Sequence, residues 1–130
     1  MTKPQLVAAA LAIVAVLVFD TIAAFISKGS GLGYRWFGIL EILLYVAIGF
    51  FGARVTGTWR GGLGVVVIAA VAEATLGWYI SALIGPGAVP AKASLPIIVS
   101  AALFAILWNG IFGLVGALIG ARFARTATPG

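Results

Sequence analysis

Four long apolar runs alternate with short polar or glycine-rich segments along the chain. The runs lie at about residues 5–26, 34–53, 63–84 and 96–121. At about 1.5 Å per residue, each run is long enough to cross a hydrocarbon core of roughly 30 Å as an α-helix. The pattern therefore predicts an all-α, polytopic membrane protein with four transmembrane helices, in a single domain that covers residues 1–130.

The segments between the runs predict how the helices are connected. Residues 28–33 (KGSGLG) and 56–62 (TGTWRGG) are short and rich in glycine, so they predict turns between antiparallel neighbours. Residues 85–95 form the longest connection, and Ser94 followed by Pro96 is typical of a helix start. We expect an up-down bundle of two hairpins, followed by a polar tail over residues 122–130.

The composition indicates that this helical protein is solvated by lipid. Hydrophobic residues make up 63% of the chain and charged residues only 8%, whereas about a quarter of the residues of a soluble domain are charged. The net charge of +5 does not indicate nucleic-acid binding, because the eight Lys and Arg residues are scattered at the ends of the apolar runs. The expected surroundings are a lipid bilayer, with no nucleic-acid partner.

The basic residues also predict an orientation. One side of the expected membrane carries Lys3, Arg54, Arg60, Arg122 and Arg125, and the other carries Lys28, Arg35 and Lys92. Cytoplasmic loops carry the excess of Lys and Arg in membrane proteins. We therefore expect a multi-pass integral protein of a prokaryotic plasma membrane with both termini in the cytoplasm.

All three acidic residues, Asp20, Glu41 and Glu73, lie within predicted helices. Glu73 and Asn109 fall near the expected midplane, and Asp20 and Glu41 lie one layer further out. A midplane acid opposes insertion by roughly 2.5–3.5 kcal/mol, whereas each Leu, Ile or Val favours insertion by about 0.3–0.6 kcal/mol. The third helix can therefore insert with Glu73, but its carboxyl group needs polar partners.

The helical period predicts where those partners come from. On a period of 3.6 residues Glu73 shares a face with Gly77, and Glu41 shares one with Tyr45. We expect Tyr45 to hydrogen-bond Glu41. The candidate ion- or proton-binding residues are Glu73, Glu41, Asp20, Asn109 and Tyr45. Small residues allow close helix packing, and the expected packing positions are Gly77, Gly110, Gly113, Gly116 and Gly120.

Two interpretations of the acids remain open. In the structural one, interhelical hydrogen bonds merely hold the helices together, and Arg35 or Lys28 reaches down to Asp20. In the functional one, Glu73 binds a proton or cation together with Glu41 or Asp20.

Catalytic and metal chemistry have no support in the residue types. The chain contains no Cys and no His, which removes thiolate chemistry and most zinc, haem and iron–sulfur ligation. The three acids lie on separate predicted helices, so they match no local ligand motif. We expect no catalytic residues, no metal site and no cofactor, and the protein is not predicted to be an enzyme.

The sequence therefore favours a small proton- or cation-linked membrane transporter or channel. A single four-helix bundle has a packed interior, so any transport path is expected to be narrow or to lie between protomers of an oligomer. The alternative is a non-catalytic accessory or assembly subunit of a larger membrane protein complex, which glycine-rich faces and short loops also suit. The expected protein partners are further copies of the chain or the other subunits of that complex.

Overall fold

The computed structural model describes residues 2–85 and 92–127, apart from the side chains at positions 34, 35 and 125–127. Its elements are α1 (Lys3–Ser30), a 3-10 turn η1 (Tyr34–Phe37), α2 (Gly38–Thr56), α3 (Trp59–Ala72), a π-helical turn η2 (Glu73–Gly77), α4 (Trp78–Ile84) and α5 (Leu95–Ala127). Because α3, η2 and α4 form one continuous rod, the described chain has four helices long and apolar enough to cross a membrane. The prediction of an all-α chain with four such helices is confirmed.

Capping residues set the end of α1 and move it beyond the predicted boundary. The helix continues to Ser30, four residues past the predicted end. Gly31 then adopts a left-handed conformation with φ of 73°, and its N–H donates to the carbonyl of Ser27. Such a C-cap requires φ above zero, which glycine adopts without steric penalty. The segment predicted as a turn is thus partly helical.

The connection between α2 and α3 is shorter than predicted. Gly57, with φ of 79°, caps α2, and the Thr58 hydroxyl accepts a hydrogen bond from the Gly61 N–H at 3.0 Å. This N-cap starts α3 at Trp59, so most of the predicted turn over residues 56–62 is helical. At the C-terminal end, α5 begins at Leu95 as expected but runs six residues past the predicted boundary at 121.

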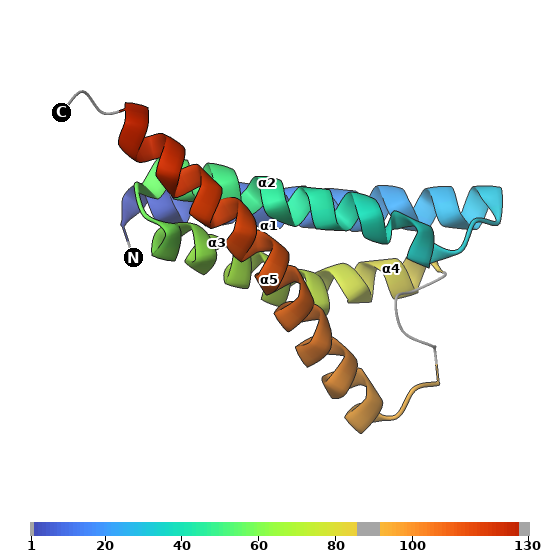
Figure 1. Cartoon of the computed structure of the whole chain (residues 1–130). Helices are drawn as coiled ribbons and strands as arrows, with labels where there is room; N and C mark the ends of the chain where they lie inside the picture. The colour runs from blue at the N-terminus through green and yellow to red at the C-terminus, as the bar shows by residue number, and fades with distance from the viewer. Residues whose placement is uncertain (1, 86–91, 128–130) are drawn as a thin grey trace.

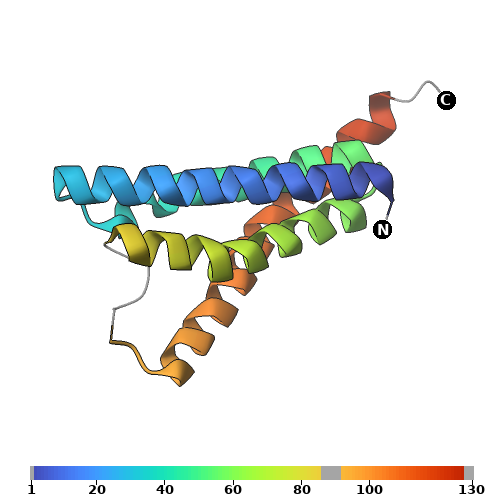
Figure 2. The ribbon, with the colours of Figure 1, turned by 180° about the vertical axis from the view of Figure 1, so that it is seen from behind.

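Successive helices run in opposite directions, and both termini lie at the same end of the molecule (Figure 1). Helices α1, α2 and the α3–α4 rod lie side by side, whereas α5 crosses them obliquely (Figures 1 and 2). The C-terminal half of α5 packs on α2 and α3, but residues 95–100 are all exposed. Only 11% of the most apolar part of this helix is buried within the molecule.

Glycines bring the backbones of α2 and α5 into contact. A Cβ atom added at Gly116 would overlap the carbonyl oxygen of Val46, and one added at Gly120 would overlap that of Phe50. Close backbone approach at small residues is a common way for membrane helices to pack. Of the other expected packing positions, Gly113 lies close to a neighbouring helix, because a Cβ there would overlap Val66 of α3. Gly110 does not, because a Cβ there would meet nothing within 4 Å.

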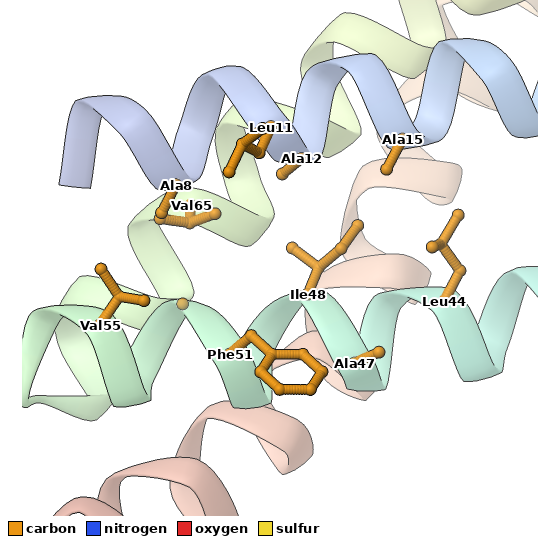
Figure 3. Close-up of a pocket in the computed structure, with 11 residues that line it drawn as sticks. Ala8, Leu11, Ala12, Ala15, Leu44, Ala47, Ile48, Phe51, Val55 and Val65 are labelled. Atoms are coloured by element: carbon orange, nitrogen blue, oxygen red, sulfur yellow. The ribbon is translucent and has the colours of Figure 1, made fainter. Parts of the chain in front are cut away.

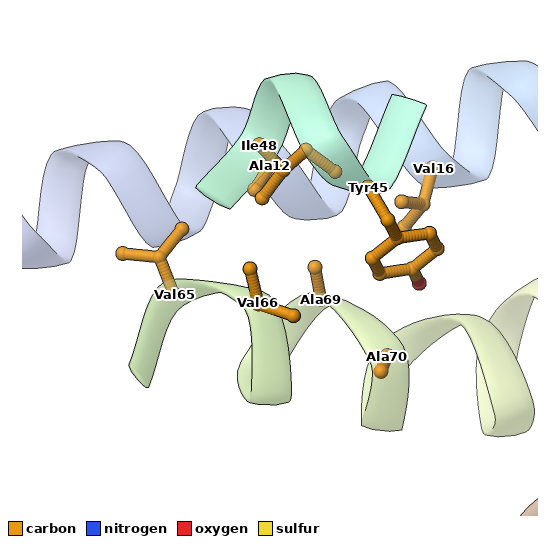
Figure 4. Close-up of a cluster of buried hydrophobic side chains, with 8 residues drawn as sticks. All are labelled: Ala12, Val16, Tyr45, Ile48, Val65, Val66, Ala69 and Ala70. Carbon is orange, nitrogen blue, oxygen red and sulfur yellow. The ribbon is translucent and has the colours of Figure 1, made fainter. Parts of the chain in front are cut away.

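The core lies between α1, α2 and α3 and is built from small and β-branched side chains around Tyr45 (Figure 4). Helix α1 contributes Ala12 and Val16 from one face. Asp20 lies one turn further along the same face and is also buried. The apolar packing of α1 therefore directs a carboxyl group into the molecule.

Candidate functional site

Tyr45 of α2 is fully buried and donates a hydrogen bond from its hydroxyl group to Glu73 Oε2. Its ring lies among apolar side chains, and the hydroxyl oxygen points towards α3 (Figure 4). The predicted partner was Glu41, one turn away on the same helix. That expectation is wrong because the ring crosses the interface between α2 and α3, where it reaches the carboxyl group of the facing helix.

Asn109 of α5 connects two of the acids. Its side chain is only 3% exposed, and its Nδ2 donates to Glu41 Oε1 at 2.9 Å and to Glu73 Oε2 at 3.3 Å. One carboxamide thus uses both N–H bonds to link α5 with α2 and with η2. Its Oδ1 is buried and has no hydrogen-bond partner within the described part of the chain.

Glu73 is the first residue of the π-helical turn η2. In this turn the Trp78 N–H reaches back to the Glu73 carbonyl, and the Thr75 hydroxyl donates to the carbonyls of Val71 at 2.7 Å and Ala72 at 3.2 Å. Single π-turns within α-helices are rare and are frequent at functional sites. The sequence pattern does not predict η2, because the apolar run continues through it without interruption.

The buried face of the rod continues through the π-turn. Residues four apart lie close to one helical turn from each other and share a face, and Glu73, Gly77 and Ser81 are all buried. Gly77 lies on the side of the rod that faces α1, because a Cβ atom there would overlap Asp20.

Asp20 of α1 approaches Glu73 over Gly77. A Cβ atom added at Gly77 would overlap Asp20 Oδ2 and would lie 3.4 Å from Glu73 Cγ. The lack of a side chain at Gly77 therefore makes room for the Asp20 carboxyl group, which is 2% exposed and interacts directly with that of Glu73. Of the two basic residues considered as partners for Asp20, Lys28 is exposed, and the side chain of Arg35 lies outside the described part.

The structure brings all five candidate residues into one polar cluster. Helix α1 supplies Asp20, α2 supplies Glu41 and Tyr45, η2 supplies Glu73, and α5 supplies Asn109. The hydrogen bonds that Glu41 and Glu73 accept in this cluster come from a phenol and a carboxamide, which are neutral donors. Such a cluster can take up and release positive charge at its carboxyl groups.

Metal ligation has little support in the same region. Across residues 2–85 and 92–127, no group of three or more His, Cys, Asp or Glu side chains is arranged to hold a metal ion. Asn109 also presents N–H groups to the two Glu side chains, whereas a metal ion would require oxygen ligands there.

A separate apolar cavity of about 280 Å³ lies between α1 and α2 (Figure 3). Small and branched side chains line it, among them Ala12, Ala15, Leu44 and Ala47. None of the five polar residues contributes to its wall. The cavity and the polar cluster are therefore lined by different residues.

Comparisons with protein-family models, with curated protein sequences and with solved structures give no match for this chain.

Proposed function

We propose that this protein is a small membrane transport protein or channel in which Glu73 binds a proton or cation. The observation that supports this proposal is the gathering of all three acidic residues of the chain in one polar cluster, in which Asp20 and Glu73 are buried and Glu41 is half-buried. Ionisable residues within membrane helices oppose insertion, are rare and mark ion pathways or proton relays. Polar packing alone is available from Ser, Thr, Asn or Gln without this penalty.

The donors around Glu73 suit a group whose charge changes during a transport cycle. Tyr45 and Asn109 both bond to Oε2, so they stabilise the carboxylate. Neither donor carries a charge, so neither locks Glu73 in that state as a buried Lys or Arg would. The π-turn at the same residue adds a backbone segment whose hydrogen bonding differs from that of the flanking helices.

The proposal includes insertion in a prokaryotic plasma membrane with both termini in the cytoplasm. The four long apolar helices and the common end of the two termini support it. Helix α5 has 33 residues and would be about 50 Å long. A helix longer than the hydrocarbon core tilts or extends beyond it, and the oblique course of α5 is consistent with tilting.

A non-catalytic accessory or assembly subunit of a larger membrane complex is the second candidate. The start of α5 favours it, because residues 95–100 are all exposed and leave an apolar surface uncovered. The same surface suits further copies of the chain, with a path between protomers. Purification from native membranes in mild detergent separates the two: co-purifying foreign chains in fixed ratio favour the subunit, and a pure homo-oligomer favours the transporter.

Reconstitution into lipid vesicles tests the leading proposal. We expect the wild-type protein to dissipate an imposed gradient of protons, Na⁺ or K⁺, and Glu73→Gln to reduce the flux to that of protein-free vesicles. Tyr79→Phe is a suitable control, because the Tyr79 side chain is exposed, whereas that of Glu73 is buried. Unchanged flux in Glu73→Gln would exclude the proposed role of Glu73.

A further inference from the structure

The Asp20 and Glu73 carboxyl groups meet at the site where Gly77 provides space for them. A Cβ atom at Gly77 would overlap Asp20 Oδ2 and would lie 3.4 Å from Glu73 Cγ. Two carboxylates in contact repel each other strongly when they are buried. One proton between them replaces that repulsion with a short, charge-assisted hydrogen bond.

The hydrogen bonds that Glu73 accepts from α2 and α5 favour the contact between Asp20 and Glu73 as the place for a proton. Tyr45 and Asn109 both donate to Oε2, and Asn109 also donates to Glu41. An amide nitrogen therefore already lies between Glu41 and Glu73, and a cation between those two acids would meet N–H groups. At Gly77, by contrast, no side chain separates the carboxyl groups of Asp20 and Glu73.

Asn109 Oδ1 is an independent sign that the cluster has a second protonation state. This oxygen is buried and accepts no hydrogen bond from any described residue, and a buried acceptor without a donor is unfavourable. If Glu41 takes up a proton, reversal of the amide allows Oδ1 to accept a hydrogen bond from the new O–H group. The same side chain can thus serve both states of the acid.

We propose that the ion bound by this cluster is a proton, shared between Asp20 and Glu73, and that Asn109 reverses its amide when Glu41 takes up a further proton. This inference rests on the proposed transport function. The further step forms one O–H bond at Glu41, breaks one O–H bond in hydronium and leaves a water molecule. The titratable groups that face Glu73 are Asp20 from α1 and Glu41 and Tyr45 from α2, whereas α5 contributes the neutral Asn109.

Infrared spectroscopy of the purified protein at neutral pH tests the shared proton directly. A protonated carboxyl group has a carbonyl stretch that a carboxylate lacks, and this band shifts in D₂O. We expect the band in the wild-type protein, its loss in Asp20→Asn and in Glu73→Gln, and its retention in Glu41→Gln and Tyr79→Phe. Absence of the band from the wild type, or its persistence in both Asp20→Asn and Glu73→Gln, would overturn the proposal.

Two additions keep the test decisive. Circular dichroism establishes whether the variants fold. If they do not, the presence or absence of the band in the infrared spectrum of the wild-type protein decides whether a carboxyl group is protonated. Addition of Na⁺ or K⁺ should leave the band unchanged, and its loss on addition of either ion would show that a metal cation takes the place of the proton. A band without flux of any ion would contradict the transport function alone, whereas metal-ion flux without a band would contradict the proton site alone.

Discussion

Neutral hydrogen-bond donors allow the carboxyl group of Glu73 to remain buried. Tyr45 reaches it from α2 and Asn109 reaches it from α5, and both donors are themselves buried. A hydrogen bond to a charged group contributes about 1.5–3 kcal/mol to stability, and loss of one partner leaves the other group unsatisfied. Single conservative changes in this cluster should therefore have measurable effects.

Tyr45→Phe removes one donor to Glu73 and keeps the aromatic ring in the core. We expect the free energy of unfolding in detergent to fall by about 1–3 kcal/mol. The matched change Tyr79→Phe should alter it by less than about 0.5 kcal/mol, because Tyr79 is 65% exposed. Denaturant titration of both variants measures the difference, and equal effects would show that the Tyr45 hydroxyl does not stabilise Glu73.

Asn109→Asp replaces two N–H donors with a fourth carboxyl group in the cluster, of nearly the same shape as the amide. The new group faces Glu41 and Glu73, so we expect a loss of about 1–3 kcal/mol or more at neutral pH. Protonation removes the repulsion, so the deficit relative to the wild type should shrink as the pH falls. A variant as stable as the wild type at neutral pH would contradict the observed hydrogen bonds.

Prediction from the sequence succeeded better for the choice of polar residues than for their pairing. The confinement of Asp20, Glu41 and Glu73 to apolar runs marked them as unusual, and the helical period placed Tyr45 near Glu41. The period gives the face of each helix but not the rotation of one helix against another. That rotation decides that Tyr45 bonds to Glu73.

At the scale of elements, small local features set the positions of the helices. Left-handed glycines at Gly31 and Gly57 end α1 and α2, and the Thr58 hydroxyl starts α3. These ends differ from the predicted ones, because glycine within a segment does not show whether the residue caps a helix or lies inside one. Likewise, the apolar pattern around Glu73 is compatible with an α-helix or a π-turn.

The packing of α2 against α5 gives a matched pair of glycine substitutions. A Cβ at Gly116 would overlap the backbone of Val46, so Gly116→Ala should destabilise the protein by about 1–3 kcal/mol through overpacking. Gly110→Ala has open space and should be neutral or stabilising by up to about 1 kcal/mol, because alanine favours a helix over glycine. Thermal unfolding in one detergent compares the two, and equal destabilisation would contradict this packing.

For the whole molecule, the polar cluster and the exposed part of α5 set the main constraints on function. The acids gather where α1, α2, η2 and α5 meet, whereas the apolar cavity lies elsewhere, between α1 and α2. The oblique course of α5 was not predicted, because a helix that is apolar all round does not reveal which part packs on its neighbours. The proposed ion transport therefore requires a change at the helix contacts around Glu73.

The absence of cysteine allows a clean test of the membrane orientation. Thr58 lies at the end of the molecule that carries the termini, and Gly29, which has open space around it, lies at the opposite end of α1. We expect a membrane-impermeant thiol reagent applied to intact cells to label Gly29→Cys and to label Thr58→Cys only after permeabilisation. The reverse pattern would place the termini outside, and labelling of both from one side would contradict a four-span topology.

The most direct test of the role of Glu73 is proton flux into vesicles that contain the purified protein and a trapped pH-sensitive dye. Under an imposed membrane potential, we predict acidification with the wild type and with Tyr79→Phe, and the rate of protein-free vesicles with Glu73→Gln. Glu73→Asp, which keeps a carboxyl group, should retain part of the flux. Wild-type flux in Glu73→Gln would contradict the assignment of Glu73 as the ion-binding acid.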